Sequence, residues 1–135
     1  MFELKFKDES LKTRKVLIEK ADYINEAYEA SKNYIEARGL DEGVILALYQ
    51  SLVQEVFPRK EEDKEGKWYT VTLKTNDEKP TKHIVVIEAK SADRSLIRAK
   101  EIMEQGYDME PVSTKESGLQ DVIDATQYRV YDSQN

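Results

Sequence analysis

The residue types that perform acid–base, nucleophilic or metal chemistry are few in this chain. His83 is the only histidine, and there is no cysteine. A metal site or a histidine-based catalyst needs partners at fixed spacing, and the sequence supplies none around His83. Ser51 and Ser117 lack the strand–turn–helix setting of a nucleophilic serine. We therefore predict a non-catalytic protein that needs no metal or cofactor.

Pairs and runs of carboxylates are the other candidates for chemistry. Glu19 and Glu88 lie at equivalent positions of two similar segments, so they could meet as an acid–base pair or a cation site. The nearby Lys15, Lys20 and Lys90 instead offer cross-strand partners, which favours two exposed strand residues. The acidic run at residues 61–63 lacks the spacing of a calcium loop. The five glycines form no phosphate-binding motif.

Basic residues concentrate in two short segments although the formal net charge is −6. Lysines beside exposed aromatic rings are typical of proteins that bind single-stranded nucleic acid. Alternatively, the aromatic rings face the core and the lysines only keep the other face soluble. The candidate residues for binding nucleic acid or another anion are Lys5, Lys12, Arg14, Lys15, Lys74, Lys82, His83 and Trp68.

The eight tyrosines are many for a chain of 135 residues. Tyrosine has an apolar ring and a polar hydroxyl, and it is therefore enriched in protein interfaces. The tyrosines could form a contact between copies of the chain, or they could lie at the edge of the core with their hydroxyl groups hydrated. The candidate interface residues are Tyr23, Tyr34, Tyr128 and Tyr131.

The chain contains an internal repeat. Residues 2–7 align with 69–74, residues 16–19 with 85–88, and residues 51–57 with 117–123, in the same order and with nearly constant offset. Several matches in one order indicate a duplicated unit. We predict repeats at residues 1–58 and 67–123, joined by a charged linker at 59–66 and followed by a tail at 124–135.

Each repeat predicts the same order of elements. Apolar residues alternate with polar ones at 2–7 and 69–74, which is typical of half-buried strands, and second strands at 15–20 and 83–90 complete two hairpins. The apolar residues of 24–35 and 92–103 recur at helical spacing. Asp22 can cap the first helix, and glycines at 39 and 106 can end the two helices.

A third strand and a short closing segment complete each repeat. The apolar segment 43–50 predicts a strand buried on both faces or at the interface of the two repeat copies, whereas Pro111 marks segment 109–115 as an edge strand. The closing segments at 52–57 and 117–123 carry a few apolar residues each. The resulting fold class is α+β, a single domain of mostly antiparallel sheet with two packed helices related by a pseudo-twofold axis.

The sequence shows no apolar run long enough to cross a membrane, and its first residues lack the apolar core of a signal peptide. Cysteine is absent. We expect a cytoplasmic protein without a membrane partner, in the host cytoplasm if a phage encodes it.

The two-copy plan resembles a family of small proteins of unknown function from gut bacteria, their mobile elements and phages. The resemblance rests on Trp68-Tyr69, on residues 24–27 of the first helix and on residues 55–58, and it covers nearly the whole chain. The equivalent segment 121–124 lacks the closing proline. The family has no established activity, so the resemblance implies a phage or mobile-element setting and little about mechanism.

Three functions remain open at this stage. The first is an accessory protein that binds single-stranded nucleic acid through its basic hairpins. The second is sequestration of a signalling nucleotide or another anionic ligand at an oligomer interface, as an anti-defence protein. The third is a protein–protein adaptor or virion component, in which segment 127–131 pairs with a sheet edge of its own chain or of a second copy.

Overall fold

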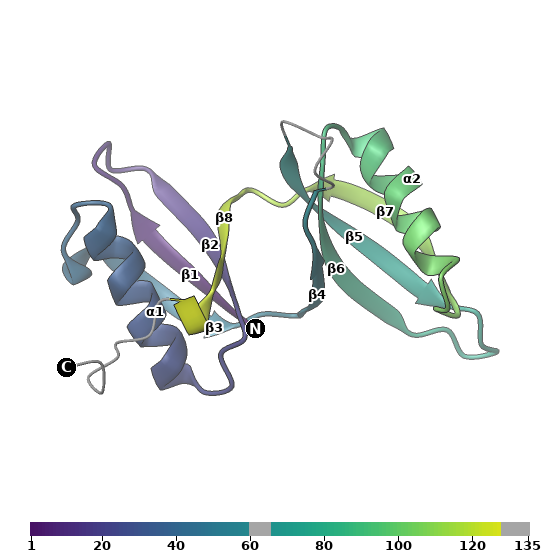
Figure 1. Ribbon diagram of the computed structural model, residues 1–135, viewed down its shortest axis with the longest axis horizontal. Coiled ribbons are helices and arrows are strands. Elements are labelled where there is room, and N and C mark those ends of the chain that lie inside the picture. The colour runs from purple at the N-terminus through teal and green to yellow at the C-terminus, as the bar shows by residue number, and fades with distance from the viewer. Residues whose placement is uncertain (60–65, 128–135) are drawn as a thin grey trace. The chain divides into compact units, whose positions relative to one another are not determined.

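The computed structural model describes residues 1–59 and 66–127, and Figure 1 shows its ribbon. Although the sequence predicts one domain, the chain divides into two compact units. Unit 1 comprises Met1–Ser51 and the chain from Leu119 onward, whereas unit 2 is the continuous segment Leu52–Gly118. Both units are α+β with a mostly antiparallel sheet, so the predicted fold class is confirmed.

Unit 1 is a four-stranded sheet with one long helix on one face (Figure 1). The strand order is β3-β1-β2-β8, and β8 is parallel to β2 while the other neighbours are antiparallel. Its elements are β1 (Phe2–Lys7), β2 (Thr13–Glu19), α1 (Ile24–Ala37), the 3-10 turn η1 (Glu42–Val44), β3 (Ile45–Gln50), β8 (Leu119–Asp124) and the 3-10 turn η2 (Ala125–Gln127).

Unit 2 has the same layout, with strand order β4-β6-β5-β7 and β4 parallel to β6. Helix α2 lies along one face of its sheet (Figure 1). Its elements are β4 (Val53–Phe57), β5 (Lys67–Thr75), β6 (Lys82–Ala89), α2 (Ala92–Met103) and β7 (Met109–Glu116).

Each unit has its own apolar core between the sheet and its helix. Alternate residues of β1 and β5 point at the helix, as the period-2 pattern predicts. The core of unit 1 includes Leu4, Phe6, Ile18 and Ile35, and the core of unit 2 is made of Val71, Leu73, Val85, Ile87, Ala99 and Met103. The aromatic residues Phe2, Phe6 and Tyr69 therefore face the cores.

The closing segments of the two repeats form strands, and each strand lies in the sheet of the other repeat. Strand β8 belongs to the second repeat by sequence, yet it pairs with β2 of the first, where Val122 faces Leu17 and Ile123 faces Ile18. Strand β4 belongs to the first repeat, yet it pairs with β6 of the second.

The exchange is reciprocal and uses the same register. In unit 2, Val56 faces Val86 and Phe57 faces Ile87, which are the repeat equivalents of the residues paired in unit 1. Ile123 contributes to the core of unit 1, and Phe57 packs on the core of unit 2. Each core is therefore completed by a residue from the other sequence repeat.

Hydrogen bonds satisfy main-chain groups at both ends of helix α1. Its N-cap is Tyr23, not the predicted Asp22, because the carbonyl group of Tyr23 accepts the first helical hydrogen bond, from the N–H of Ala27 at 3.2 Å. The carboxylate of Glu26 accepts the main-chain N–H groups of Asp22 and Tyr23 at 3.2 Å. At the other end, Gly39 adopts the predicted left-handed conformation at φ 76°. The N–H groups of Gly39 and Leu40 donate to Glu36 and Ile35, which satisfies two carbonyl groups of the last turn.

Strand β3 departs from its prediction. Its apolar sequence suggested burial on both faces or at the interface of the two repeat copies, but β3 is the outer strand of its sheet and each of its residues is half-buried or exposed. An apolar strand is therefore an edge strand in this sheet. Strand β7, predicted as an edge, is one. The linker residues 60–65 and the tail residues 128–135 lie outside the described residues.

Candidate functional site

The basic candidates of unit 1 divide between the two faces of its hairpin. Lys5 and Lys15 are direct cross-strand partners on the face opposite α1. The Nζ atom of Lys15 lies 4.0 Å from a carboxylate oxygen of Glu3, whereas Lys5 has no carboxylate partner among the described residues. Two lysines held side by side repel each other, and a bound anion would relieve that repulsion.

Arg14 and Lys12 have a structural role in the β1–β2 turn. The carboxylate of Asp8, which is buried, accepts the Nε–H of Arg14 at 2.7 Å and the N–H groups of Ser10 and Lys12 at 2.8 and 3.0 Å. The hydrogen bond from Arg14 is the main reason why the pKa of Asp8 is lowered. Arg14 therefore holds the turn, while the ammonium group of Lys12 stays exposed beside it.

The basic candidates of unit 2 form a second cross-strand pair. Lys74 and Lys82 face each other at the turn end of the β5–β6 hairpin, and both are exposed. Neither has a carboxylate partner among the described residues. Lys67 differs, because its Nζ donates to Glu116 at 2.8 Å.

The structure separates Trp68 from these lysines. Trp68 shares the face of Lys74 but lies six residues earlier on β5, which corresponds to roughly 20 Å along an extended strand. It pairs across the hairpin with Glu88. Unit 2 therefore does not combine an aromatic platform with its lysine pair in one place.

His83 also lies apart from the lysine pair. It pairs with Leu73, a core residue, so it lies on the sheet face that packs against α2. Its ring nitrogen Nδ1 is hydrogen-bonded to the side-chain carbonyl of Gln54 in β4. This bond joins β6 to the exchanged strand β4, which is a structural role.

Buried apolar residues limit the extent of each basic surface. Leu17 and Val86 are almost fully buried, although they lie on the sheet faces that point away from the helices. The lysine pairs are thus confined to the parts of the hairpins nearer their turns. We call the lysines of these two surfaces the hairpin-end lysines. They are Lys5, Lys12 and Lys15 in unit 1 and Lys74 and Lys82 in unit 2.

The tyrosine candidates do not form one surface. Tyr34 is 3% exposed and packs edge-to-face on Phe6 with ring centroids 6.1 Å apart, so its prediction as an interface residue is wrong. Its place in the apolar stripe of α1 explains the burial. Tyr23 is 70% exposed at the start of α1. Tyr128 and Tyr131 lie outside the described residues.

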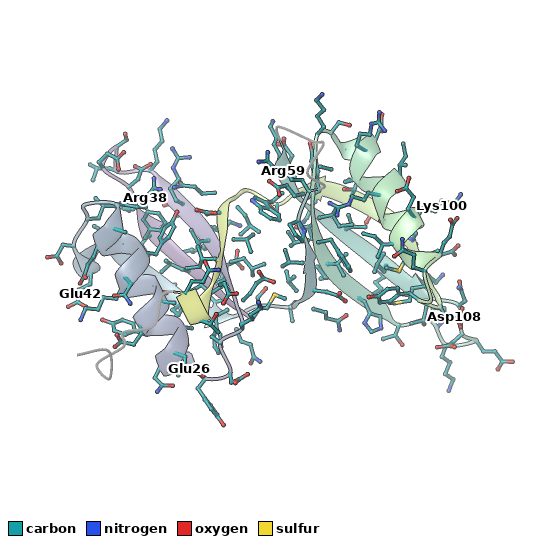
Figure 2. The ribbon with its side chains drawn as sticks, in the orientation of Figure 1. Glu26, Arg38, Glu42, Arg59, Lys100 and Asp108 are labelled. Atoms are coloured by element: carbon teal, nitrogen blue, oxygen red, sulfur yellow. The ribbon has the colours of Figure 1, made fainter. Side chains whose placement is uncertain are left out.

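Sequence reasoning missed a cavity of about 450 Å³ in unit 2. It lies between the C-terminal end of α2, the start of β7 and the β5–β6 turn, near Lys100 and Asp108 in Figure 2. Met103 and Met109 give it an apolar side, and Lys100, Glu104 and Glu110 give it charged groups of both signs. These residues are scattered in the sequence without a motif, so no sequence signal marked them.

Two negative observations apply to the described residues, 1–59 and 66–127. They contain no cluster of three or more side chains suited to holding a metal ion. They also contain no helix with the length and hydrophobicity required to cross a membrane. Comparisons with family models, curated proteins and solved structures found no match to this chain.

Proposed function

We propose that this protein is a non-catalytic binding protein that contacts the phosphates of single-stranded nucleic acid through its hairpin-end lysines. The observation that carries the proposal is the cross-strand pairing of Lys74 with Lys82 and of Lys5 with Lys15. Like charges directly opposite each other destabilise a hairpin, and a phosphate group between them would turn that cost into a favourable interaction. The phage or mobile-element setting rests on the sequence resemblance alone.

A binding titration against salt tests the proposal. Fluorescence anisotropy with a labelled single-stranded oligonucleotide should show an affinity that falls steeply with salt, because each phosphate contact adds about 0.7 to the log–log slope. The double variant Lys74→Glu/Lys82→Glu should weaken binding at least tenfold and lower the slope by about 1.4, if both lysines contact phosphates.

The matched control is Lys90→Glu, which makes the same type of charge change at an exposed lysine of unit 2 outside the hairpin end. It should change the affinity by less than the double variant and leave the slope nearly unchanged. Absence of binding at low salt, or equal losses in Lys90→Glu and in either single hairpin variant, would contradict the proposal. A duplex of the same length shows whether single strands are preferred.

A second candidate function is sequestration of a small nucleotide or another anionic ligand, and the cavity near Lys100 favours it. Its volume lies within the range of small-molecule sites. Glu104 and Glu110 oppose a highly charged anion there, so this function ranks second. A thermal-shift screen with cyclic and linear nucleotides tests it, and loss of any shift in Lys100→Ala would place the ligand in this cavity.

A further inference from the structure

Strand β3 exposes its outer edge in unit 1 and differs from the other edge strands of the two sheets. Its sequence, Ile45–Gln50, contains no charged residue and no proline. Among the described residues, β1 is its only strand neighbour. Edge strands of soluble proteins usually carry charges or prolines that prevent further pairing. Strand β7 follows that rule with Glu110, Pro111, Lys115 and Glu116.

The hydrogen bonds of the sheet identify which groups on β3 point outward. The N–H of Ser51 donates to the carbonyl of Met1 at 2.9 Å, which fixes the alternation along the strand. Tyr49 and Ala47 then bond to β1, while the main-chain groups of Gln50 and Leu48 point away from the sheet. The bulge opposite Lys5 and Phe6 interrupts the pairing only at Leu46.

We infer that β3 pairs antiparallel with β3 of a second copy of this chain and joins two four-stranded sheets into one. An antiparallel pair of identical strands has twofold symmetry, so the interface closes as a dimer. In one register, both outward-facing residues form hydrogen bonds, because Leu48 of one copy pairs with Gln50 of the other. The two Tyr49 side chains then lie opposite each other at the centre of the interface.

The uncharged sequence of β3 favours a second copy as the occupant, because the strand can lie against its own twofold copy without like charges in contact. The side chain of Tyr49 also gains contacts, because it is partly exposed and lies opposite its copy at the centre of the interface. Cross-strand pairs of aromatic side chains stabilise antiparallel strands.

Light scattering of the full chain after size-exclusion chromatography tests the dimer. The mass should rise with concentration from 15.7 kDa towards twice that value. Gln50→Pro removes one outward N–H group and leaves the bonds to β1 in place, so it should abolish the dimer. The matched control is Glu116→Pro, at the equivalent position of β7, where the outward N–H group should be dispensable and the dimer should persist.

A second pair of variants tests the dimer in case the proline variants fail to fold. Tyr49→Lys places two positive charges opposite each other at the centre of the interface and should weaken dimerisation at least tenfold, whereas Val112→Lys, at a residue of β7 that is 50% exposed, should not. In the wild type, hydrogen exchange at the amides of Leu48 and Gln50 should slow as concentration rises. A monomer at millimolar concentration, or equal effects of the β3 and β7 variants, would overturn the inference.

Discussion

The ammonium group of Lys20 donates a hydrogen bond to Asp124 at 2.8 Å although 104 residues separate the two in sequence. Lys20 follows β2 of the first repeat, and Asp124 ends β8 of the second. The ion pair lies where the exchanged strand leaves the sheet of unit 1. It raises the pKa of Lys20 and lowers that of Asp124. The tertiary structure of unit 1 therefore depends on the last described part of the chain.

The first prediction concerns the residue that β8 contributes to unit 1. Ile123→Ala should cost about 2–5 kcal/mol, because it removes a buried side chain from a core that cannot fully collapse. Unit 1 should lose this stability, although Ile123 belongs to the second repeat by sequence. Hydrogen exchange should therefore accelerate in α1 and remain slow in α2.

The reverse variant controls for this result. Phe57→Ala lies in the first repeat by sequence but packs on the core of unit 2, so it should accelerate exchange in α2. The emission of Trp68, which lies in β5, gives an independent readout of unit 2. If each variant instead loosens the helix of its own sequence repeat, the strands are not exchanged in solution.

The second prediction is that the structural unit folds alone and the sequence repeat does not. A fragment of residues 52–118 contains all four strands and the helix of unit 2. It should show a cooperative urea transition. A fragment of residues 67–123 lacks β4 and carries β8 without its partner β2, so it should be unfolded or aggregate. Circular dichroism distinguishes the two, and equal folding of both fragments would contradict the exchange.

The hairpins, the helices and the β7 edge could be predicted because each follows from local sequence. Alternation identified Phe2, Leu4 and Phe6 as core residues, and helical spacing placed Ala99 and Met103 in the second core. The exchange of β4 and β8 did not follow from local patterns. Residues 16–18 and 85–87 are similarly apolar, so the closing strands fit either sheet equally well by composition.

One signal in the sequence does reveal the exchange when it is combined with topology. Strand β3 runs parallel to β2, because both are antiparallel to β1. A strand beside β2 and parallel to it must start at the opposite end of the sheet, which requires a crossover of about a dozen residues. Only Ser51 and Leu52 connect β3 to β4. Strand β4 cannot return to its own sheet through so short a connection.

The candidate binding residues could be placed only in part. Period-2 alternation predicted that lysines of β1 and β5 face away from the helices. It did not predict that Lys74 and Lys82 are direct cross-strand partners, nor that Arg14 binds Asp8, because these facts depend on hairpin register and turn geometry. Sequence periodicity defines a face but not the position along it.

The third prediction concerns backbone strain in the β1–β2 turn. Leu11 has a positive φ of 62° and is 76% exposed, so its side chain gains little from burial while its backbone occupies the left-handed region. Leu11→Gly should stabilise the protein by about 0.5–1 kcal/mol, since the relief of strain exceeds the entropy cost of glycine. Leu11→Ala keeps the Cβ atom and should give no such gain in urea unfolding.

The last prediction is a pH dependence that originates at Asp8. Its pKa is lowered from 3.8 in the folded state, mainly by the hydrogen bond from Arg14. The folded state therefore favours the ionised carboxylate, and this contribution to stability is complete above the unfolded pKa and disappears as the pH falls through the folded one. Asp8→Asn should lower the urea midpoint at pH 7, and the difference from the wild type should shrink below about pH 4.

Two variants assign that pH dependence to the contact between Asp8 and Arg14. Arg14→Gln keeps a long polar side chain but removes the charge, so it should destabilise the protein at pH 7, and its effect should shrink as the pH falls below about 4. In the double variant with Asp8→Asn, the two losses should not add, because each removes the same 2.7 Å contact. Additive losses, or a difference that stays constant down to pH 3, would show that Arg14 does not set the acid sensitivity of this turn.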